Sequence, residues 1–240
     1  QVRLTSFTQE MQRRGMEPGV VMLQAETVQT CISIAYVGVL LSLATSFTYY
    51  SKRYFLSAGR SFLFFWLIFD ALIHIFRTCT YFSHAVEGPF VYLSVNGRTV
   101  SSSNGFFASL WQEYSHADSR WGVADPGIVS VEALTVLLKG PLALYTAWLV
   151  LKSNEKYHIY LCFLCLSELY GDYMTFVPEW FTNTAALDTQ DPLHLWFYLV
   201  ISNGVWVVIP GFLLIQSTCA LSRMVDAVSV KSQSSSKKAV

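Results

Sequence analysis

Charged residues are scarce in this sequence. They make up 13% of its 240 residues, against 53% for hydrophobic residues, whereas an average soluble domain carries about 25% charged residues. The 16 basic and 16 acidic side chains also cancel in net charge, so no excess of positive charge points to a nucleic acid. The composition is that of a membrane protein, for which we expect membrane lipids as partners and no nucleic acid.

Cysteine is sparse as well. The five cysteines are an odd number and lie mostly in apolar runs, which argues against a disulfide framework. Cys162 and Cys165 form a CxxC pair inside an apolar run without a second such pair, and we interpret them as core residues, not as metal ligands. The sequence also lacks a glycine-rich phosphate loop and a nucleophile elbow, which excludes the enzyme classes that these motifs define.

Long apolar runs are abundant instead. A helix of about 20 apolar residues crosses the hydrocarbon core of a bilayer. We predict an all-α membrane protein in which five transmembrane helices enclose an intramembrane ligand cavity within residues 28–222. An N-terminal segment precedes this domain, and a polar tail of residues 223–240 follows it. The predicted spans are residues 28–50, 61–83, 127–151, 157–180 and 194–221.

The distribution of basic residues predicts the orientation in the membrane. Lys and Arg gather in the links at 52–60 and 152–156 and in the tail, and positive links face the cytosol. The N-terminus (residues 1–27) and the insert at 84–126 then face the lumen, although Arg13 and Arg14 argue weakly the other way. Lys237 and Lys238 near the C-terminus match a dilysine signal for retrieval to the endoplasmic reticulum, which functions on a cytosolic tail.

The lumenal insert carries its own local signals. Asn96-Gly97 lies between β-branched residues, which predicts a small β-hairpin. The second half of the insert predicts a short helix and a turn.

Ionisable residues interrupt the second predicted span. Asp70, His74, Arg77 and Thr78 lie on one helical face, and a charge at mid-bilayer costs about 2.5–3.5 kcal/mol on insertion scales. These groups must therefore face protein, water or a ligand. Two interpretations stay open here, namely a buried polar pair that joins helices, and an intramembrane site with a proton-handling histidine.

Other parts of the sequence resemble one family. In the segment LWQEYSHADSR, residues Trp111, Glu113, Tyr114, Asp118, Ser119 and Arg120 resemble the LWKEYxxxDSR stretch of the emopamil-binding protein family, the sterol Δ8–Δ7 isomerases. The similarity covers roughly residues 61–215. It continues through Glu132, Thr135, Gly140-Pro141, Tyr170-Gly171-Asp172, Trp196-Phe197-Tyr198, Asn203, Trp206 and Pro210-Gly211.

The resemblance implies a five-helix protein of the endoplasmic reticulum membrane. Its cavity would take a polycyclic sterol and move a ring double bond by protonation and deprotonation, without a cofactor or a metal. Residues at matching positions are His74, Glu132, Thr135, Asn203 and Trp206. The chain departs from the family at Thr78, where a glutamate is usual, and it carries additional charges at Asp70, Arg77, Lys139 and Glu168.

A double-bond shift through a cation needs one acid and one base. Glu132 is the candidate acid, because a carboxylic acid in apolar surroundings can keep its proton at neutral pH. His74 is the candidate base or relay, and Asp70 either orients its ring or neutralises Arg77 or Lys139. Aromatic faces stabilise a cation. Candidate substrate-binding residues are Thr78, Thr135, Asn203, Trp206, Trp196 and Tyr198, with Asp118 and Arg120 closing the lumenal mouth.

We therefore predict an intramembrane isomerase that acts through a carbocation on a polycyclic sterol-like or terpenoid substrate. The reaction is a double-bond shift, an epoxide rearrangement or a cyclisation. Two alternatives stay open, a genuine sterol Δ8–Δ7 isomerase and a non-enzymatic sterol- or amphiphile-binding membrane protein. A homodimer also stays open.

Overall fold

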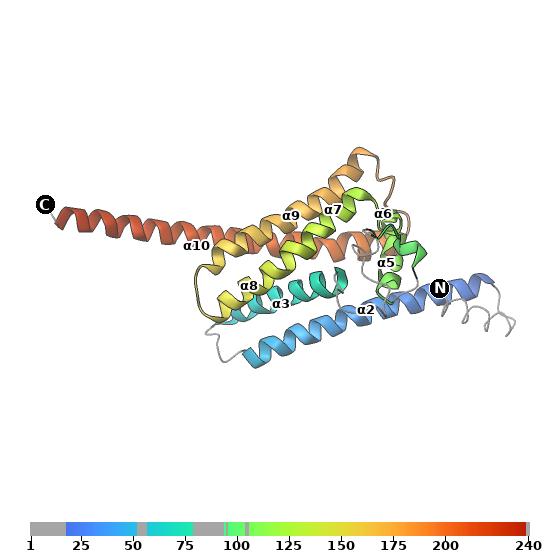
Figure 1. The fold of residues 1–240 in the computed structure, drawn as a ribbon, viewed down its shortest axis with the longest axis horizontal. Coiled ribbons are helices and arrows are strands. Elements are labelled where there is room, and N and C mark those ends of the chain that lie inside the picture. Colours follow the sequence, from blue (N-terminus) through green and yellow to red (C-terminus); the bar gives the residue numbers. More distant parts are fainter. Residues whose placement is uncertain (1–17, 52–56, 79–93, 95, 104–105, 239–240) are drawn as a thin grey trace.

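The structure is a computed structural model. It describes residues 18–51, 57–78, 94, 96–103 and 106–238, which are drawn in colour in Figure 1. Within these ranges, side chains are described except at residues 18–26, 75–78, 106–107 and 234–238.

Five long helical stretches make up most of the described residues, and they run along the length of the molecule (Figure 1). Each lies where the sequence predicts an apolar helix. Two of them contain a segment of π-helix, labelled η3 and η4. The stretches are α2 (Pro18–Ser51), α3 (Ala58–Thr78), α7–η3–α8 (Pro126–Leu134, Thr135–Lys139, Gly140–Leu151), α9 (Tyr157–Phe181) and η4–α10 (Leu193–Ile201, Ser202–Lys238).

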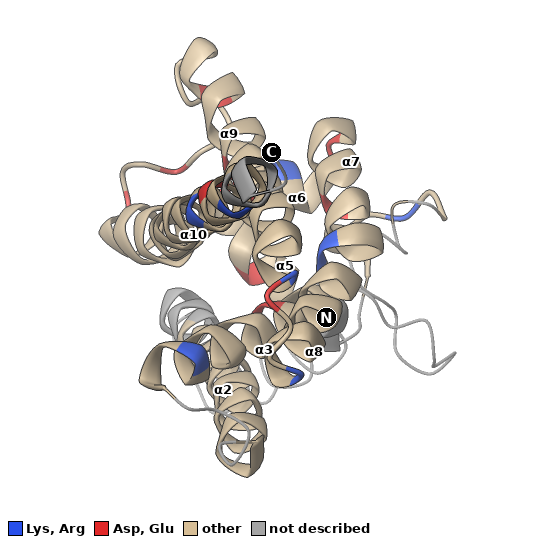
Figure 2. Cartoon of the chain, turned by 90° about the vertical axis from the view of Figure 1, so that its left-hand side faces the viewer, with Lys and Arg blue, Asp and Glu red and all other residues tan. Residues whose placement is uncertain are grey.

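The chain is an all-α membrane protein, as predicted. Among the described residues, three helices are long and apolar enough to cross a membrane, namely Thr27–Ser51, Pro126–Leu151 and Leu193–Gln233. Large apolar side chains such as Leu137, Phe163 and Val208 point outward and are more than half exposed, which suits a lipid environment. Figure 2, which looks along the molecule, shows how few charged positions the long helices carry. The described residues contain no β-strand.

The hydrophobic core joins the long helices. Leu67 of α3, Ala147 of α8 and Leu164 of α9 are almost completely buried in it, and Leu213 of α10 belongs to the same cluster. Trp206 of α10 packs on α3, where its ring centroid lies 4.8 Å from that of Trp66.

The insert between α3 and α7 differs from the prediction in one respect. Its chain turns at Asn96-Gly97, where Gly97 has a φ of +68°, but the next residues form a short 3₁₀ helix, η2 (Val100–Ser102), and not the second strand of a hairpin. The reason is local, because a capping box stabilises the start of this helix: the Thr99 side chain accepts from the Ser102 N–H, and the Ser102 side chain accepts from the Thr99 N–H. The predicted first strand lies outside the described residues.

The short helices of the insert form a second core at one end of the bundle. α5 (Phe106–Ala117) and α6 (Ser119–Val123) bring Trp111, Tyr114 and Trp121 against Tyr198 of η4. The rings of Trp111 and Trp121 stack with centroids 4.2 Å apart. The end of α2, the start of α3, the α8–α9 turn and the C-terminal part of α10 lie at the opposite end (Figure 1).

Candidate active site

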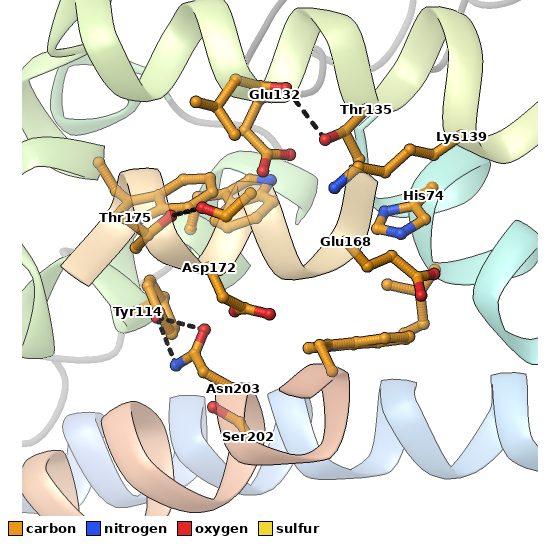
Figure 3. A pocket seen from close by; sticks show the side chains of 16 residues that line it. His74, Tyr114, Glu132, Thr135, Lys139, Glu168, Asp172, Thr175, Ser202 and Asn203 are labelled. Carbon is orange, nitrogen blue, oxygen red and sulfur yellow. Dashed lines mark hydrogen bonds between the residues drawn. The ribbon is translucent and has the colours of Figure 1, made fainter. Parts of the chain in front are cut away.

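A polar cavity of about 120 Å³ lies within the bundle, between α3, α7–η3, α9 and α10, with α5 and α6 at one end. Its walls carry an imidazole, an ammonium group and three carboxyl groups, a rare concentration inside apolar helices. Figure 3 shows these side chains converging from different helices. The polar residues of its lining are His74, Tyr114, Glu132, Thr135, Lys139, Glu168, Asp172, Thr175, Ser202 and Asn203.

The π-helical segment η3 forms one wall of this cavity. π-Turns are uncommon and often accompany functional sites. Here the segment directs Thr135 and Lys139 inward, where both are buried, while Leu137 and Leu138 point outward. Pro141 follows directly, and its ring nitrogen cannot donate to the preceding turn. Glu132, Thr135 and Lys139 are spaced three and four residues apart, which places them on one helical face, and all three line the cavity.

Lys139 reaches across the cavity to α9. Its Nζ lies 2.8 Å from the position that a Cβ atom would occupy at Gly171. A residue larger than glycine at this position would therefore displace the ammonium group. Gly171 thus provides the space in which the one lysine of the cavity lining sits, near the carboxyl groups of the same cavity.

His74 and Asp70 of α3 lie one helical turn apart on the same face. His74 Nε2 is 2.9 Å from Asp70 Oδ1. The imidazole lines the cavity, whereas Asp70 is completely buried behind it. The ring of Trp206 faces the imidazole with centroids 5.6 Å apart, so an aromatic face and a titratable base border the same space.

The second π-helical segment, η4, positions Asn203. The Asn203 Nδ2 group donates to the carbonyl oxygens of Tyr198 at 2.8 Å and Leu199 at 2.9 Å, which a π-turn leaves available. The same group also donates to the Tyr114 hydroxyl at 3.1 Å. Figure 3 shows Asn203 and Ser202 on α10 across the cavity from Glu132 of α7. The Asn203 amide is therefore fixed in direction.

Four residues predicted to bind substrate lie outside the cavity lining. Trp196 is 60% exposed on the outer face of η4. Tyr198 is buried and donates to Glu113 Oε1 at 2.9 Å, which also accepts from Thr30 at 2.5 Å. Asp118 and Arg120 lie just beyond one end of the cavity. The side chain of Thr78, also predicted to bind substrate, lies outside the described residues.

Arg120 joins α6 to the C-terminal end of α9. Its guanidinium donates twice to the Asp118 carboxylate, at 2.9 and 2.7 Å, and once to the carbonyl of the cavity residue Thr175 at 2.8 Å. Glu179 approaches it at 3.4 Å. Burial alone would lower the Arg120 pKa, but its hydrogen bond and charge interaction with Asp118, together with the charge of Glu179, raise it. This network connects α6 to α9 at Thr175, a residue of the cavity lining.

We predict that Arg120→Ala destabilises the fold by roughly 3–5 kcal/mol, because it leaves the fully buried Asp118 carboxylate without its partner. Arg60→Ala is the matched control, since it removes an ion pair to Glu155 that is partly exposed to solvent, and exposed ion pairs contribute at most about 1 kcal/mol. Unfolding midpoints of both variants in detergent check this. Equal shifts would contradict it.

A loop stabilised by Asp188 lies beside the same end. Asp188 Oδ2 is 2.6 Å from His194 Nδ1, and its Oδ1 accepts from the backbone N–H groups of Gln190 and Asp191. The hydrogen bond from His194, and then those of the two amides, hold the pKa of Asp188 below its ordinary value of 3.8. A lowered pKa contributes stability above the ordinary value, and this contribution is lost as the pH falls toward the lower folded-state value.

Asp188→Asn should therefore lower the thermal midpoint at neutral pH, because it removes this contribution. The difference from the wild type should shrink once the pH falls below about 3.8. Midpoints measured across a pH series test this, and a difference that is independent of pH would contradict the assignment to Asp188 ionisation.

Sequence reasoning missed part of the site. Glu168, Lys139 and Asp172 line the cavity, although only their charge within apolar runs marked them. Tyr114 and Thr175 also line it, and neither carries a signal beyond its place in the family motif or its polarity.

A larger apolar pocket of about 540 Å³ adjoins the polar cavity between α9 and η4–α10. Asp172 and Asn203 line both spaces. The remainder of the pocket lining is mainly hydrocarbon and aromatic, for example Phe176, Trp180 and Leu195. A ligand with a large apolar part can occupy this pocket while its polar or reacting part reaches the cavity.

Comparisons with known proteins agree with the resemblance in the sequence. The model of the family EXPERA (EXPanded EBP superfamily) matches residues 106–217, which include every cavity residue except those on α3. A probable 3-beta-hydroxysteroid-Delta(8),Delta(7)-isomerase of Oryza sativa subsp. japonica is 31% identical over 205 residues, which are 83% of this chain and 85% of the relative. The chain belongs to the EBP family.

Other relatives in this family differ in their products. The 3-beta-hydroxysteroid-Delta(8),Delta(7)-isomerase of Cavia porcellus is 30% identical over 59% of this chain and 61% of its own length. Isomeliandiol synthase of Melia azedarach is 25% identical over 63% of this chain and 65% of its own length. The chain spans about three fifths of the length of the isomerases of Cavia porcellus and Rattus norvegicus, 61% and 59% respectively.

Proposed function

We propose that this protein is an intramembrane isomerase of a polycyclic sterol-like or terpenoid substrate, and that it acts through a carbocation by acid–base catalysis without a cofactor. The observation that carries the proposal is the convergence of Glu132, His74 and Trp206 on one cavity inside the helix bundle. The family supports it, because its members include steroid isomerases and an isomeliandiol synthase.

The positions of the side chains fit a two-step proton exchange. Glu132 donates its proton to an alkene carbon or an epoxide oxygen, which creates a cation. His74 accepts a proton from a neighbouring carbon, and the electron pair of the broken C–H bond forms the new double bond. Asp70, 2.9 Å away, orients the imidazole. Trp206 presents its ring beside the imidazole, where a π face stabilises a cation.

The two adjoining spaces favour a ligand of mixed character. The polar cavity of about 120 Å³ is too small for a polycyclic skeleton, whereas the apolar pocket of about 540 Å³ offers room for hydrocarbon. Rings or a long side chain would lie in the pocket, and the reacting bond would lie in the cavity. The additional charges of Lys139 and Glu168 favour a substrate other than a Δ8 steroid.

We also propose that five helices span the endoplasmic reticulum membrane within residues 28–222, with the N-terminus and the insert lumenal and the tail cytosolic. Support comes from the basic α8–α9 turn and the C-terminal part of α10, which lie at the same end of the molecule (Figure 1), as the positive-inside rule requires. Cysteine reporters at Ser57 and Thr189 should label from opposite sides. Labelling from one side would contradict this topology.

Turnover by purified protein tests the enzymatic proposal. The probes are a 3β-hydroxy-Δ8-steroid and a tetracyclic triterpenoid with a side-chain epoxide, and the products are separated by gas chromatography and mass spectrometry. We expect a product with the formula of its substrate, formed faster from the triterpenoid. If both probes bind and neither is converted, the protein is an amphiphile-binding member of the family and the proposal fails.

A further inference from the structure

Two carboxyl groups lie close together at the edge of the cavity. Asp70 of α3 is fully buried and Glu168 of α9 is 3% exposed. One oxygen of each carboxyl and one nitrogen of His74 all lie within 4.8 Å of one another. Glu168 and His74 line the cavity, whereas Asp70 does not. The three groups form a cluster in which Glu168 and His74 border the cavity and Asp70 is buried in the protein interior.

This cluster lacks hydrogen-bond donors. Among the described residues, none donates a hydrogen bond of good geometry to any of the four oxygens of Asp70 and Glu168. Two unpaired carboxylates this close together in apolar surroundings would be strongly penalised by desolvation and by mutual repulsion. A single proton removes the repulsion and reduces the buried charge from two to one, because it neutralises one carboxyl and makes it a hydrogen-bond donor to the other.

The neighbouring charged side chains do not stabilise the two carboxyl groups in place of this proton. His74 lies 2.9 Å from Asp70 but without good hydrogen-bond geometry. Lys139 of η3 holds its ammonium group against Gly171, one turn along α9 from Glu168, and no ion pair joins it to either carboxyl among the described residues. Asp172 on α9 and Glu132 on α7 are further carboxyl groups of the same cavity and bring no positive charge to it.

We propose that Asp70 and Glu168 share one proton and that this carboxyl pair restores the protonation state of the site after each reaction. The catalytic consequence rests on the proposed isomerase function, whereas the shared proton does not. Glu168 is a proton carrier that reaches the substrate space, and Asp70 is a positioning residue that acts through Glu168 and His74.

The proton balance closes without another reactant. After one isomerisation, Glu132 has lost a proton and His74 has gained one. The imidazolium passes its proton to Asp70, so the pair then holds two protons. Glu168 releases one of them into the cavity, where it returns to the Glu132 carboxylate. No bond to carbon changes in this sequence, and no electrons leave the site.

Infrared spectra of the purified protein without substrate test the shared proton. A protonated carboxyl has a C=O stretching band that shifts in D₂O. We expect Glu168→Gln and Asp70→Asn each to lose one such band, and the double variant to lose no more than that one band. Glu113→Gln is the matched control, because Glu113 is equally buried but accepts hydrogen bonds from Thr30 and Tyr198. It should leave the band in place.

Three results would contradict the proposal that Asp70 and Glu168 share one proton. Loss of two bands in the double variant means that each carboxyl carries its own proton. Loss of no band means that both are ionised. A stoichiometric metal ion in the purified wild type that disappears in the Glu168→Gln variant assigns the cluster to metal binding instead.

Kinetics test the restoring role separately. With a substrate that the wild type converts, Glu168→Gln should keep its first turnover within about threefold of the wild-type rate while its steady-state kcat falls at least about tenfold. Glu168→Asp should recover part of the loss. An equal fall in both rates would contradict the restoring role. If the wild type converts no substrate at all, the proposed function fails while the infrared result stands by itself.

Discussion

Replacing Glu132 by glutamine should lower kcat at least about 100-fold, the low end of general-acid effects. Glutamine has nearly the same shape and keeps the hydrogen-bonding capacity, but it cannot donate a proton to an alkene. Glu132 lines the polar cavity from α7, across from Asn203 and Ser202 of α10 (Figure 3). Ligand affinity should therefore change little, and product formation and ligand binding measured on the same preparation separate the two effects.

Glu155→Gln serves as the control for this substitution. Glu155 is a half-exposed carboxylate in the α8–α9 turn, paired with Arg60, and the turn lies at the end of the bundle away from α5 and α6. Its replacement should leave kcat at the wild-type value. An active Glu132→Gln protein would transfer the acid role to another cavity carboxyl and leave Glu132 with a packing role.

His74→Ala should lower kcat by a similar factor, because no other imidazole lines the described cavity. If Glu132 and His74 act as a unit, the double variant should cost little more than the worse single variant, since residues of one catalytic device are strongly non-additive. Steady-state rates of the two single variants and the double variant give this comparison. Losses that multiply would show that the two residues act independently.

The helices could be predicted because their signal is local. Apolar runs of about 20 residues predict the bounds of α9 to within one residue, whereas α2 begins at Pro18, ten residues before the predicted span. The common face of Glu132, Thr135 and Lys139 could be predicted as well, because helical periodicity places residues three and four apart on one side. The π-turn that carries Thr135 and Lys139 inward has no reliable sequence signal apart from the neighbouring Gly140-Pro141.

What the sequence could not provide is contact between helices. Asp70 and Glu168 are 98 residues apart in the numbering, and their approach follows from how α3 and α9 pack around the core. Trp196 shows a second limit of sequence reasoning. Its place in a family motif predicts substrate contact, but its ring is exposed on η4 and lies outside the cavity lining.

Solvent deuterium tests the central claim most directly. When purified protein converts a polycyclic substrate in D₂O, a carbocation mechanism adds one solvent-derived deuteron to the skeleton and removes one hydrogen from a neighbouring carbon. From an alkene substrate, the product should have the formula of the substrate with one deuterium bound to a single carbon, because the carboxyl protons of the site exchange with D₂O between turnovers. Glu132→Gln should form this product at least about 100-fold more slowly. A product without skeletal deuterium from an alkene substrate, or one whose formula differs by oxidation or reduction, would contradict the account.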